Sequence, residues 1–297
     1  MKILTFNTHS LVEKDYETKL LQFAEMAAVE QPEIMGLQEV NQRRDASALP
    51  EERLKGYVRC EDGEGVIREG NHAARLAGLL EKRGICYFWT WIPIKLGYDI
   101  YEEGLALFSR RPILETDQFT VSRTDDFHNW RRRKILGIRT DESWFYTVHM
   151  GWWKKDGEAF ADQWDQVLTG LQGKIGNVRN LWVMGDFNSP AQVRGEGYDY
   201  VKKTGWKDAY LLAEETHGEN TVEEAIDGWR DEKTDSGMRI DYIWSLQSVR
   251  VKSCPVICDG KEYPQVSDHF GVMIETEEEK KVDQSSRDFA IHNEPAV

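Results

Sequence analysis

The sequence lacks the long apolar run that a membrane-spanning helix needs. No segment reaches the roughly 18 consecutive apolar residues of such a helix, although 40% of the 297 residues are hydrophobic. The N-terminus, MKILTFNTHS, holds one lysine and only a short apolar run, whereas the apolar core of a secretory signal peptide spans about 7 to 15 residues. We therefore expect a cytoplasmic protein that makes no contact with a membrane.

Cysteine is also scarce. The four cysteines do not form the pattern of a disulfide framework. Cys254 and Cys258 would lie ~13 Å apart on a straight strand, beyond the reach of a disulfide. A zinc site would need further cysteine or histidine residues at close spacing, and the sequence has none there. We expect free thiols and no structural zinc.

No internal repeat and no segment rich in proline, glycine or serine divides the chain. The one change in composition is the C-terminal segment EEEKKVDQSSRDFAIHNEPAV, which contains six acidic and three basic residues. The sequence therefore predicts one domain over residues 1–276. The polar tail over 277–297 is expected to be poorly ordered or to form a short helix.

Basic residues are outnumbered, with 38 lysines and arginines against 52 aspartates and glutamates and a formal net charge of −14. The tail contributes −3 of this charge, so the predicted domain still carries −11. Long-range attraction to a polyanion requires positive potential. The charge balance thus argues against a nucleic-acid partner, except at local basic patches.

The pattern of apolar residues predicts many short strands and a few helices. The expected strands lie at residues 3–6, 34–40, 87–94, 105–109, 135–139, 144–150, 181–187, 240–245, 249–257 and 270–276. Helices are expected from Asp15, as an N-cap, to before Pro32, from about 72 to 82 and from about 158 to 174. This order favours an α/β protein with a pair of sheets covered by helices.

Polar side chains stand at the ends of several of these strands. The segment LWVMGDFNSP is typical, because Asp186 and Asn188 follow a buried run directly. Similar positions are occupied by Asn7, Glu39, His149, Asp241, Asp268 and His269. A single aspartate of this kind is most often a turn residue or a helix cap.

Several converging acids have a different consequence, because carboxylates beside a core must be paired, hydrated or bound to a cation. Oxygen ligands with few nitrogens suit Mg²⁺ or Mn²⁺ better than zinc. Such an ion neutralises phosphate oxygens, and histidine accepts protons near neutral pH. The composition of the site therefore indicates metal-assisted hydrolysis of a phosphoester.

Six motifs resemble, in order and spacing, the endonuclease/exonuclease/phosphatase superfamily. They are TFN (5–7), QE (38–39), TVH (147–149), GDFN (185–188), IDYIW (240–244) and SDH (267–269). The resemblance extends over residues 1 to about 276. It implies a DNase I-like fold, a four-layer α-β-β-α sandwich of two packed mixed sheets flanked by helices.

The resemblance also implies roles for the matching positions. The metal, Mg²⁺ or Mn²⁺, would be bound by Asn7, Glu39 and Asp268, and the catalytic residues would be His149, Asp186, Asn188, Asp241 and His269. Asp186 would orient or deprotonate the water, Asn188 would hold a phosphate oxygen, and His269 would pair with Asp241. Glu103, in EEGLALFSR, matches a glutamate that orients the first histidine, although a plain surface turn explains it as well.

The loops around this site should select the substrate. Three tryptophans, Trp130, Trp152 and Trp153, suit stacking on a sugar ring, and Arg132, Arg133 and Lys134 could hold a phosphate. The alternative is that the tryptophans are structural cover and that RRRK is a solvated edge.

The segments GYDIYEEG and RRKILG further resemble the branch that contains bacterial maltose-6'-phosphate phosphatases. We therefore expect an intracellular phosphatase that acts on a small phosphorylated sugar. An endonuclease, exonuclease or other phosphodiesterase is the alternative within the superfamily, and an inactive binding scaffold is the alternative outside it.

Overall fold

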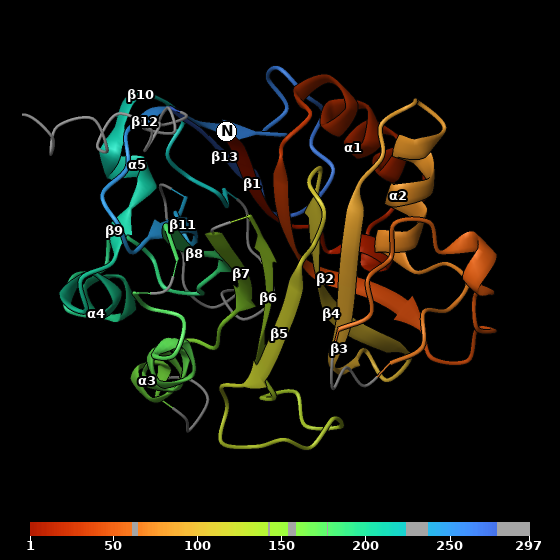
Figure 1. Ribbon diagram of the computed structural model, residues 1–297, viewed down its shortest axis with the longest axis horizontal. Helices are drawn as coiled ribbons and strands as arrows, with labels where there is room; N and C mark the ends of the chain where they lie inside the picture. Colours follow the sequence, from red (N-terminus) through yellow and green to blue (C-terminus); the bar gives the residue numbers. More distant parts are fainter. Residues whose placement is uncertain (61–64, 142, 154–158, 177, 224–236, 278–297) are drawn as a thin grey trace, which may run out of the picture.

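The computed structural model describes residues 1–60, 65–141, 143–153, 159–176, 178–223 and 237–277. Two β-sheets face each other, one of seven strands in the order β10-β12-β13-β1-β2-β4-β3 and one of six in the order β5-β6-β7-β8-β11-β9. Helices α1 and α2 lie on one side of the molecule, and α3 and α4 lie on the opposite side (Figure 1). The predicted four-layer α-β-β-α sandwich is confirmed.

The elements have the following bounds. The seven-stranded sheet contains β1 (Lys2–Asn7), β2 (Ile34–Arg43), β3 (Phe88–Gly97), β4 (Tyr101–Ser109), β10 (Ala213–His217), β12 (Val251–Ile257) and β13 (Gly271–Thr276). The six-stranded sheet contains β5 (Glu115–Thr120), β6 (Lys134–Thr140), β7 (Ser143–His149), β8 (Asn180–Asp186), β9 (Lys207–Asp208) and β11 (Asp241–Ser245). The helices are α1 (Tyr16–Glu30), α2 (His72–Glu81), α3 (Phe160–Leu171), α4 (Gly197–Lys203) and α5 (Ala209–Leu212), with short 3-10 turns η1 (Ser10–Val12) and η2 (Glu51–Arg53).

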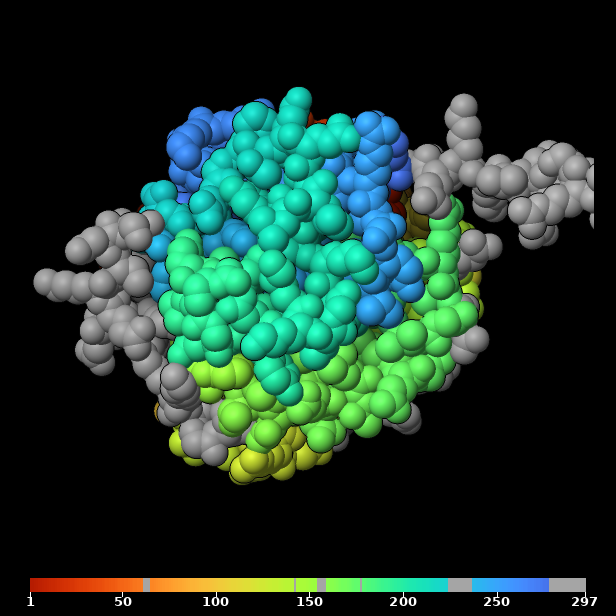
Figure 2. All heavy atoms as spheres, turned by 90° about the vertical axis from the view of Figure 1, so that its left-hand side faces the viewer, coloured from red at the N-terminus to blue at the C-terminus, as the bar shows by residue number. Residues whose placement is uncertain are grey.

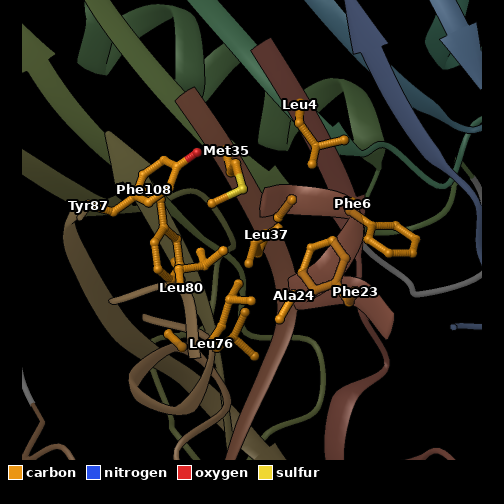
Figure 3. Packing of buried hydrophobic residues seen from close by; sticks show 14 of the residues in the cluster. Leu4, Phe6, Phe23, Ala24, Met35, Leu37, Leu76, Leu80, Tyr87 and Phe108 are labelled. Carbon is orange, nitrogen blue, oxygen red and sulfur yellow. The ribbon is translucent and has the colours of Figure 1, made fainter. Parts of the chain in front are cut away.

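Helices α1 and α2 bury their apolar stripes against the seven-stranded sheet. Phe23 of α1 contacts Phe6 of β1, with ring centroids 5.1 Å apart, and Leu76 and Leu80 of α2 join the same cluster (Figure 3). A fully buried side chain of this size stabilises the fold by roughly 1.5–3 kcal/mol. The 3.6-residue spacing of these positions in the sequence is what places them on one face.

Helix α3 covers the six-stranded sheet in the same way, through a cluster that includes Phe160, Trp164 and Phe187. The part of the chain from α3 to β10 forms much of this face, coloured green to teal in Figure 2. A third cluster fills the space between the sheets and contains Ile34 and Leu107 from one sheet and Met184 from the other. Both faces of each sheet are therefore buried, which explains why their central strands read as continuous apolar runs.

Some strands and helices were not predicted from the sequence. Strands β5, β9 and β10 were not predicted, because β9 has two residues and β5 and β10 are edge strands with mostly polar sequences, ETDQFT and AEETH. Helices α4 and α5 were missed because both are short. The predicted cap at Asp15 is wrong in one respect. Asp15 occupies the N-cap position with φ of 56°, but its side chain makes no capping hydrogen bond.

None of the four cysteines forms a disulfide, as predicted, and Cys86 is exposed whereas the others are buried. Within the described residues no helix is long and apolar enough to cross a membrane. Apart from Glu277, the predicted C-terminal tail lies outside the described residues, as does residue 158 at the predicted start of the third helix.

Candidate active site

Strand pairing gathers the polar strand ends at one edge of the sandwich. In the six-stranded sheet, β8 lies between β7 and β11, so that Asp186 is the register partner of both His149 and Asp241. In the other sheet, Asn7 at the end of β1 pairs with Gln38, the neighbour of Glu39. Residues that are more than 200 positions apart in the sequence thus come together because the central strands of both sheets end at the same edge.

Gly185 permits the close approach of β7 and β8 at this edge. Its φ is 140°, and a Cβ atom there would lie 2.0 Å from the carbonyl oxygen of Val148. Any other residue would push the two strands apart. The glycine of the GDFN motif therefore has a structural role, which is to let Asp186 lie beside His149.

Asp186 is the centre of the site. Its Oδ2 atom accepts a hydrogen bond from Asn7 Nδ2 at 3.1 Å and lies 3.6 Å from His149 Nε2 and 3.7 Å from His269 Nε2. Burial, followed by the nearby charge of Asp241, raises the pKa of the Asp186 carboxyl to about 7. A group with such a pKa, close to two imidazoles, can exchange a proton near neutral pH.

His269 and Asp241 form a buried pair, joined by a contact of 2.9 Å between Nδ1 and Oδ2. Burial alone would lower the pKa of His269. The negative charges of Asp241 and Asp186, together with the hydrogen bond to Asp241, outweigh this effect and raise the pKa to about 10. His269 is therefore positively charged at neutral pH, and the predicted pairing with Asp241 is present in the structure.

His149 has the opposite character. Burial and the positive charges of Arg133 and Lys95 hold its pKa well below the ordinary value, so the ring is neutral at pH 7. Its Nδ1 atom lies 4.0 Å from Glu103 Oε1, which is too far for a hydrogen bond. Glu103 instead pairs with Lys95 at 3.1 Å. Any effect of Glu103 on His149 in this structure is thus electrostatic.

Asn188 is fixed by two hydrogen bonds. Its backbone N–H donates to Asp186 Oδ1 at 2.8 Å, and its side-chain amide donates to the carbonyl oxygen of Met150 at 3.0 Å. Its φ of 46° lies in the left-handed region, which asparagine tolerates better than most residues. The side chain is therefore held in the cavity next to Asp186.

The predicted metal ligands Glu39 and Asp268 line the same cavity. Glu39 accepts a hydrogen bond from Asn7 Nδ2 at 3.0 Å. Burial and the charge of Glu103 raise the pKa of Glu39, which shows that its negative charge is poorly compensated. A divalent cation would supply the compensation, and carboxylate and amide oxygens are the ligands that Mg²⁺ and Mn²⁺ prefer. The carboxylates of Glu39 and Asp268 thus fit a divalent cation, whereas the Asn7 amide presents its nitrogen to Glu39 while its oxygen accepts the backbone N–H of His9.

Two residues near this position were missed in the sequence. His9 Nδ1 lies 2.8 Å from Glu13 Oε1 and 3.7 Å from Asp268 Oδ1, and Glu13 also accepts the backbone N–H of Asp268. These three side chains form one of two groups in the described residues with metal-ligand spacing, and the other group is Asp186, Asp241 and His269. His9 follows Asn7 by two residues, so the same strand-end pattern could have revealed it.

A cavity of about 200 Å³ lies at this edge of the sandwich. The strand-end wall of the cavity consists of His9, Glu39, His149, Asp186, Asn188, Asp268 and His269. The opposite wall, which we call the loop wall, consists of three loop residues, Trp130, Arg133 and Trp152, and of residues at the β3–β4 hairpin, namely Lys95, Leu96, Gly97, Tyr98 and Glu103. Of these, Lys95 and Leu96 were not singled out in the sequence, whereas Gly97 and Tyr98 belong to the segment GYDIYEEG.

Three residues that the sequence offered for substrate binding lie outside the lining. Arg132 donates from Nε to Asp125 at 3.0 Å and from Nη1 to the carbonyl oxygen of Ile94 at 3.0 Å. Trp153 packs against Phe160 and Tyr200. Lys134 is buried at the start of β6. Of the six residues that the sequence offered, the structure places Arg133, Trp130 and Trp152 in the cavity lining.

A comparison with known families supports the motif analysis. Residues 4–269 match the model of the endonuclease/exonuclease/phosphatase family. The chain belongs to this family. A comparison with curated proteins found no significant match.

Solved structures of the family have the same fold. A family protein from Leptotrichia buccalis is 29% identical, with a TM-score of 0.80, and the match covers 94% of this chain and 100% of the other. A mannosyl-6-phosphatase from Bacteroides thetaiotaomicron is 20% identical, with a TM-score of 0.62 and the same coverage. A 3' phosphatase from Neisseria, bound to a product DNA hairpin, is 18% identical, with a TM-score of 0.61 and coverage of 94% and 100%.

Membership of the endonuclease/exonuclease/phosphatase family makes the chain a hydrolase of the phosphatase and nuclease type. Enzymes of this family typically depend on a divalent metal. The cluster of buried acidic and histidine side chains agrees with such a dependence.

Proposed function

We propose that this chain is a Mg²⁺- or Mn²⁺-dependent phosphomonoesterase that acts on a small phosphorylated sugar. The observation that carries the proposal is the cavity itself. Its catalytic side chains lie in a space of about 200 Å³ that is lined on the other wall by two tryptophans and an arginine. A space of this size suits one sugar phosphate better than a polymer.

The aromatic residues of the loop wall support a sugar as the substrate. Trp130 and Trp152 lie with their ring centroids 6.3 Å apart, and Trp130 is 47% exposed. Large exposed aromatic rings beside a polar cavity offer an apolar face to a sugar ring while leaving its hydroxyl groups free for hydrogen bonds. A mannosyl-6-phosphatase has the same fold, so the fold accommodates this reaction class.

The side chains of the strand-end wall have different roles in the reaction. Asp186 accepts the proton of the attacking water, because its carboxylate is placed between the two histidines and its pKa is near neutrality. His269, charged and held by Asp241, stabilises the negative charge that develops on the phosphoryl oxygens. Asn188 and the neutral His149 orient the phosphate.

Asn7, Glu39 and Asp268 would hold the divalent cation beside these groups. Such a cation supplies positive charge for the phosphate oxygens and for the leaving oxygen.

Action on DNA is the competing function, since a Neisseria protein with this fold is described as a 3' phosphatase bound to a product DNA hairpin. The charge of this chain opposes it. The net charge of −14 disfavours a polyanion over a small substrate.

A phosphate-release screen tests the proposal. The full chain is incubated with Mg²⁺, Mn²⁺ or EDTA and with sugar phosphates, nucleotides, inositol phosphates and plasmid DNA. We expect metal-dependent phosphate release that is fastest with a sugar phosphate, and Asp186→Asn serves as the inactive control. Efficient plasmid nicking at physiological salt, without phosphate release from any small monoester, would overturn the phosphatase in favour of a nuclease.

A further inference from the structure

Arg133 brings a positive charge to the cavity without a partner from the protein. The residue is only 1% exposed, and its Nε, Nη1 and Nη2 atoms are all buried without a hydrogen-bond acceptor in the described part of the chain. The guanidinium carbon lies 5.8 Å from the centroid of the Trp152 ring, a contact that leaves the N–H groups unsatisfied. A buried cation of this kind is unfavourable until an anion joins it.

The other cations of the cavity already have partners. Lys95 pairs with Glu103 at 3.1 Å, His9 with Glu13 at 2.8 Å and His269 with Asp241 at 2.9 Å. Glu39 and Asp268 are the carboxylates that we assign to the divalent cation. Among the described residues that line the cavity, Arg133 is therefore the cation without a carboxylate partner, and a negative group that enters the cavity would supply one.

The strand pairing places Arg133 close to the reacting groups. Ile135 of β6 is the register partner of Val148 of β7. Arg133 directly precedes β6, and His149 ends β7, so the two residues lie at the same end of one antiparallel pair. Both line the cavity, and His149 in turn lies 3.6 Å from Asp186. The guanidinium therefore flanks the position of a phosphoryl group beside these reacting side chains.

We propose that Arg133 binds the terminal oxygens of a phosphomonoester dianion and thereby selects monoesters over diesters. This inference rests on the proposed function and adds the basis of its selectivity. A monoester presents three terminal oxygens and a charge of −2, whereas a diester presents two such oxygens and a charge of −1. A planar guanidinium with free N–H groups can donate to two phosphate oxygens at once. Its positive charge stabilises the dianion of a monoester more than the monoanion of a diester.

Three variants of the full chain test the inference. Arg133→Met removes the charge and keeps the length of the side chain, and Arg133→Lys keeps the charge without the planar group. Arg139→Met is the matched control, because Arg139 lies toward the other end of the same strand and pairs with Glu115. For each protein, calorimetry measures the binding of inorganic phosphate with Mg²⁺ and with EDTA. Rates are measured with p-nitrophenyl phosphate and bis(p-nitrophenyl) phosphate.

We expect Arg133→Met to weaken phosphate binding and to lower kcat/KM for the monoester by roughly 10- to 100-fold, the effect of losing hydrogen bonds to a charged group. The diester rate should change much less, Arg133→Lys should be intermediate, and Arg139→Met should match the wild type. Phosphate affinity that is unchanged in Arg133→Met would overturn the inference, as would equal losses with both esters. If the release screen finds no hydrolysis of any small monoester but Arg133→Met still weakens phosphate binding, the proposed function fails and the phosphate subsite stands.

Discussion

The two walls of the cavity differ in how their side chains are satisfied. At the strand-end wall, Asp186 and His269 are held by hydrogen bonds and charge from Asn7 and Asp241, and Glu39 is left for a cation. The loop wall offers unsatisfied or exposed groups, namely the guanidinium of Arg133 and the ring of Trp130. Side chains that are held in place by other side chains of the protein suit chemistry that is common to a family. Groups that lack a partner suit recognition of a particular substrate.

The largest effect should come from removing the metal, because this leaves the carboxylates of the strand-end wall without their counter-charge. Treatment with EDTA should abolish phosphate release, and Mg²⁺ or Mn²⁺ should restore it. Glu39→Gln keeps the shape of the side chain and should raise the Mg²⁺ concentration needed for half-maximal activity. Full turnover after exhaustive treatment with EDTA would contradict this assignment.

The next largest effect should follow from breaking the buried pair. Asp241→Asn and His269→Ala should each lower kcat by ~10²–10⁴, the usual range for acid–base groups. The double variant should be little worse than the poorer single variant, since each change removes the same interaction.

The measurement is kcat for the three variants at saturating Mg²⁺. If the losses multiply, the two residues act independently. In that case Asp241 serves only to stabilise the start of β11, and the Asp241→Asn variant should have a lower melting temperature and a nearly normal kcat.

A smaller effect is expected on the loop wall. Trp152→Ala should raise KM for a sugar phosphate about 3- to 10-fold and leave kcat nearly unchanged, because a lost aromatic contact costs about 1 kcal/mol. Trp153→Ala provides the contrast, since Trp153 packs against Phe160 and Tyr200. It should lower the melting temperature without changing KM. If Trp152→Ala and Trp153→Ala had identical kinetic effects, Trp152 could not be assigned to substrate binding and Trp153 to the framework.

The smallest effect on activity is expected from changes at His72, which belongs to neither wall and affects the stability of the fold instead. Burial and the charge of Arg75 lower its pKa from 6.5 to about 3. As the pH falls below 6.5, the unfolded chain binds a proton that the folded chain does not, so stability decreases.

Between pH 7 and pH 5 this one residue should remove about 2 kcal/mol from the free energy of unfolding. His72→Gln should lose less stability over the same interval, which urea unfolding at both pH values can measure. Equal losses in the two proteins would show that His72 is protonated in the fold.

The sequence alone determined the sandwich fold and most of the strand-end wall. Apolar runs that end in Asn7, His149 and Asp186 predict buried strands with polar ends, and this pattern depends only on local composition. The motif order then fixed the family. The domain boundary at residue 276 stays a prediction, because nearly all of the tail lies outside the described residues.

Only the tertiary structure decided which loop residues face the cavity. Arg132 and Arg133 are adjacent and identical in type, yet Arg132 pairs with Asp125 and Arg133 lines the cavity without a partner. Trp152 and Trp153 divide in the same way, with Trp152 in the lining and Trp153 against α3. Neighbouring side chains of an extended segment point in opposite directions. The direction that points into the cavity depends on how the loop packs against the two sheets. The composition of the sequence does not determine this packing.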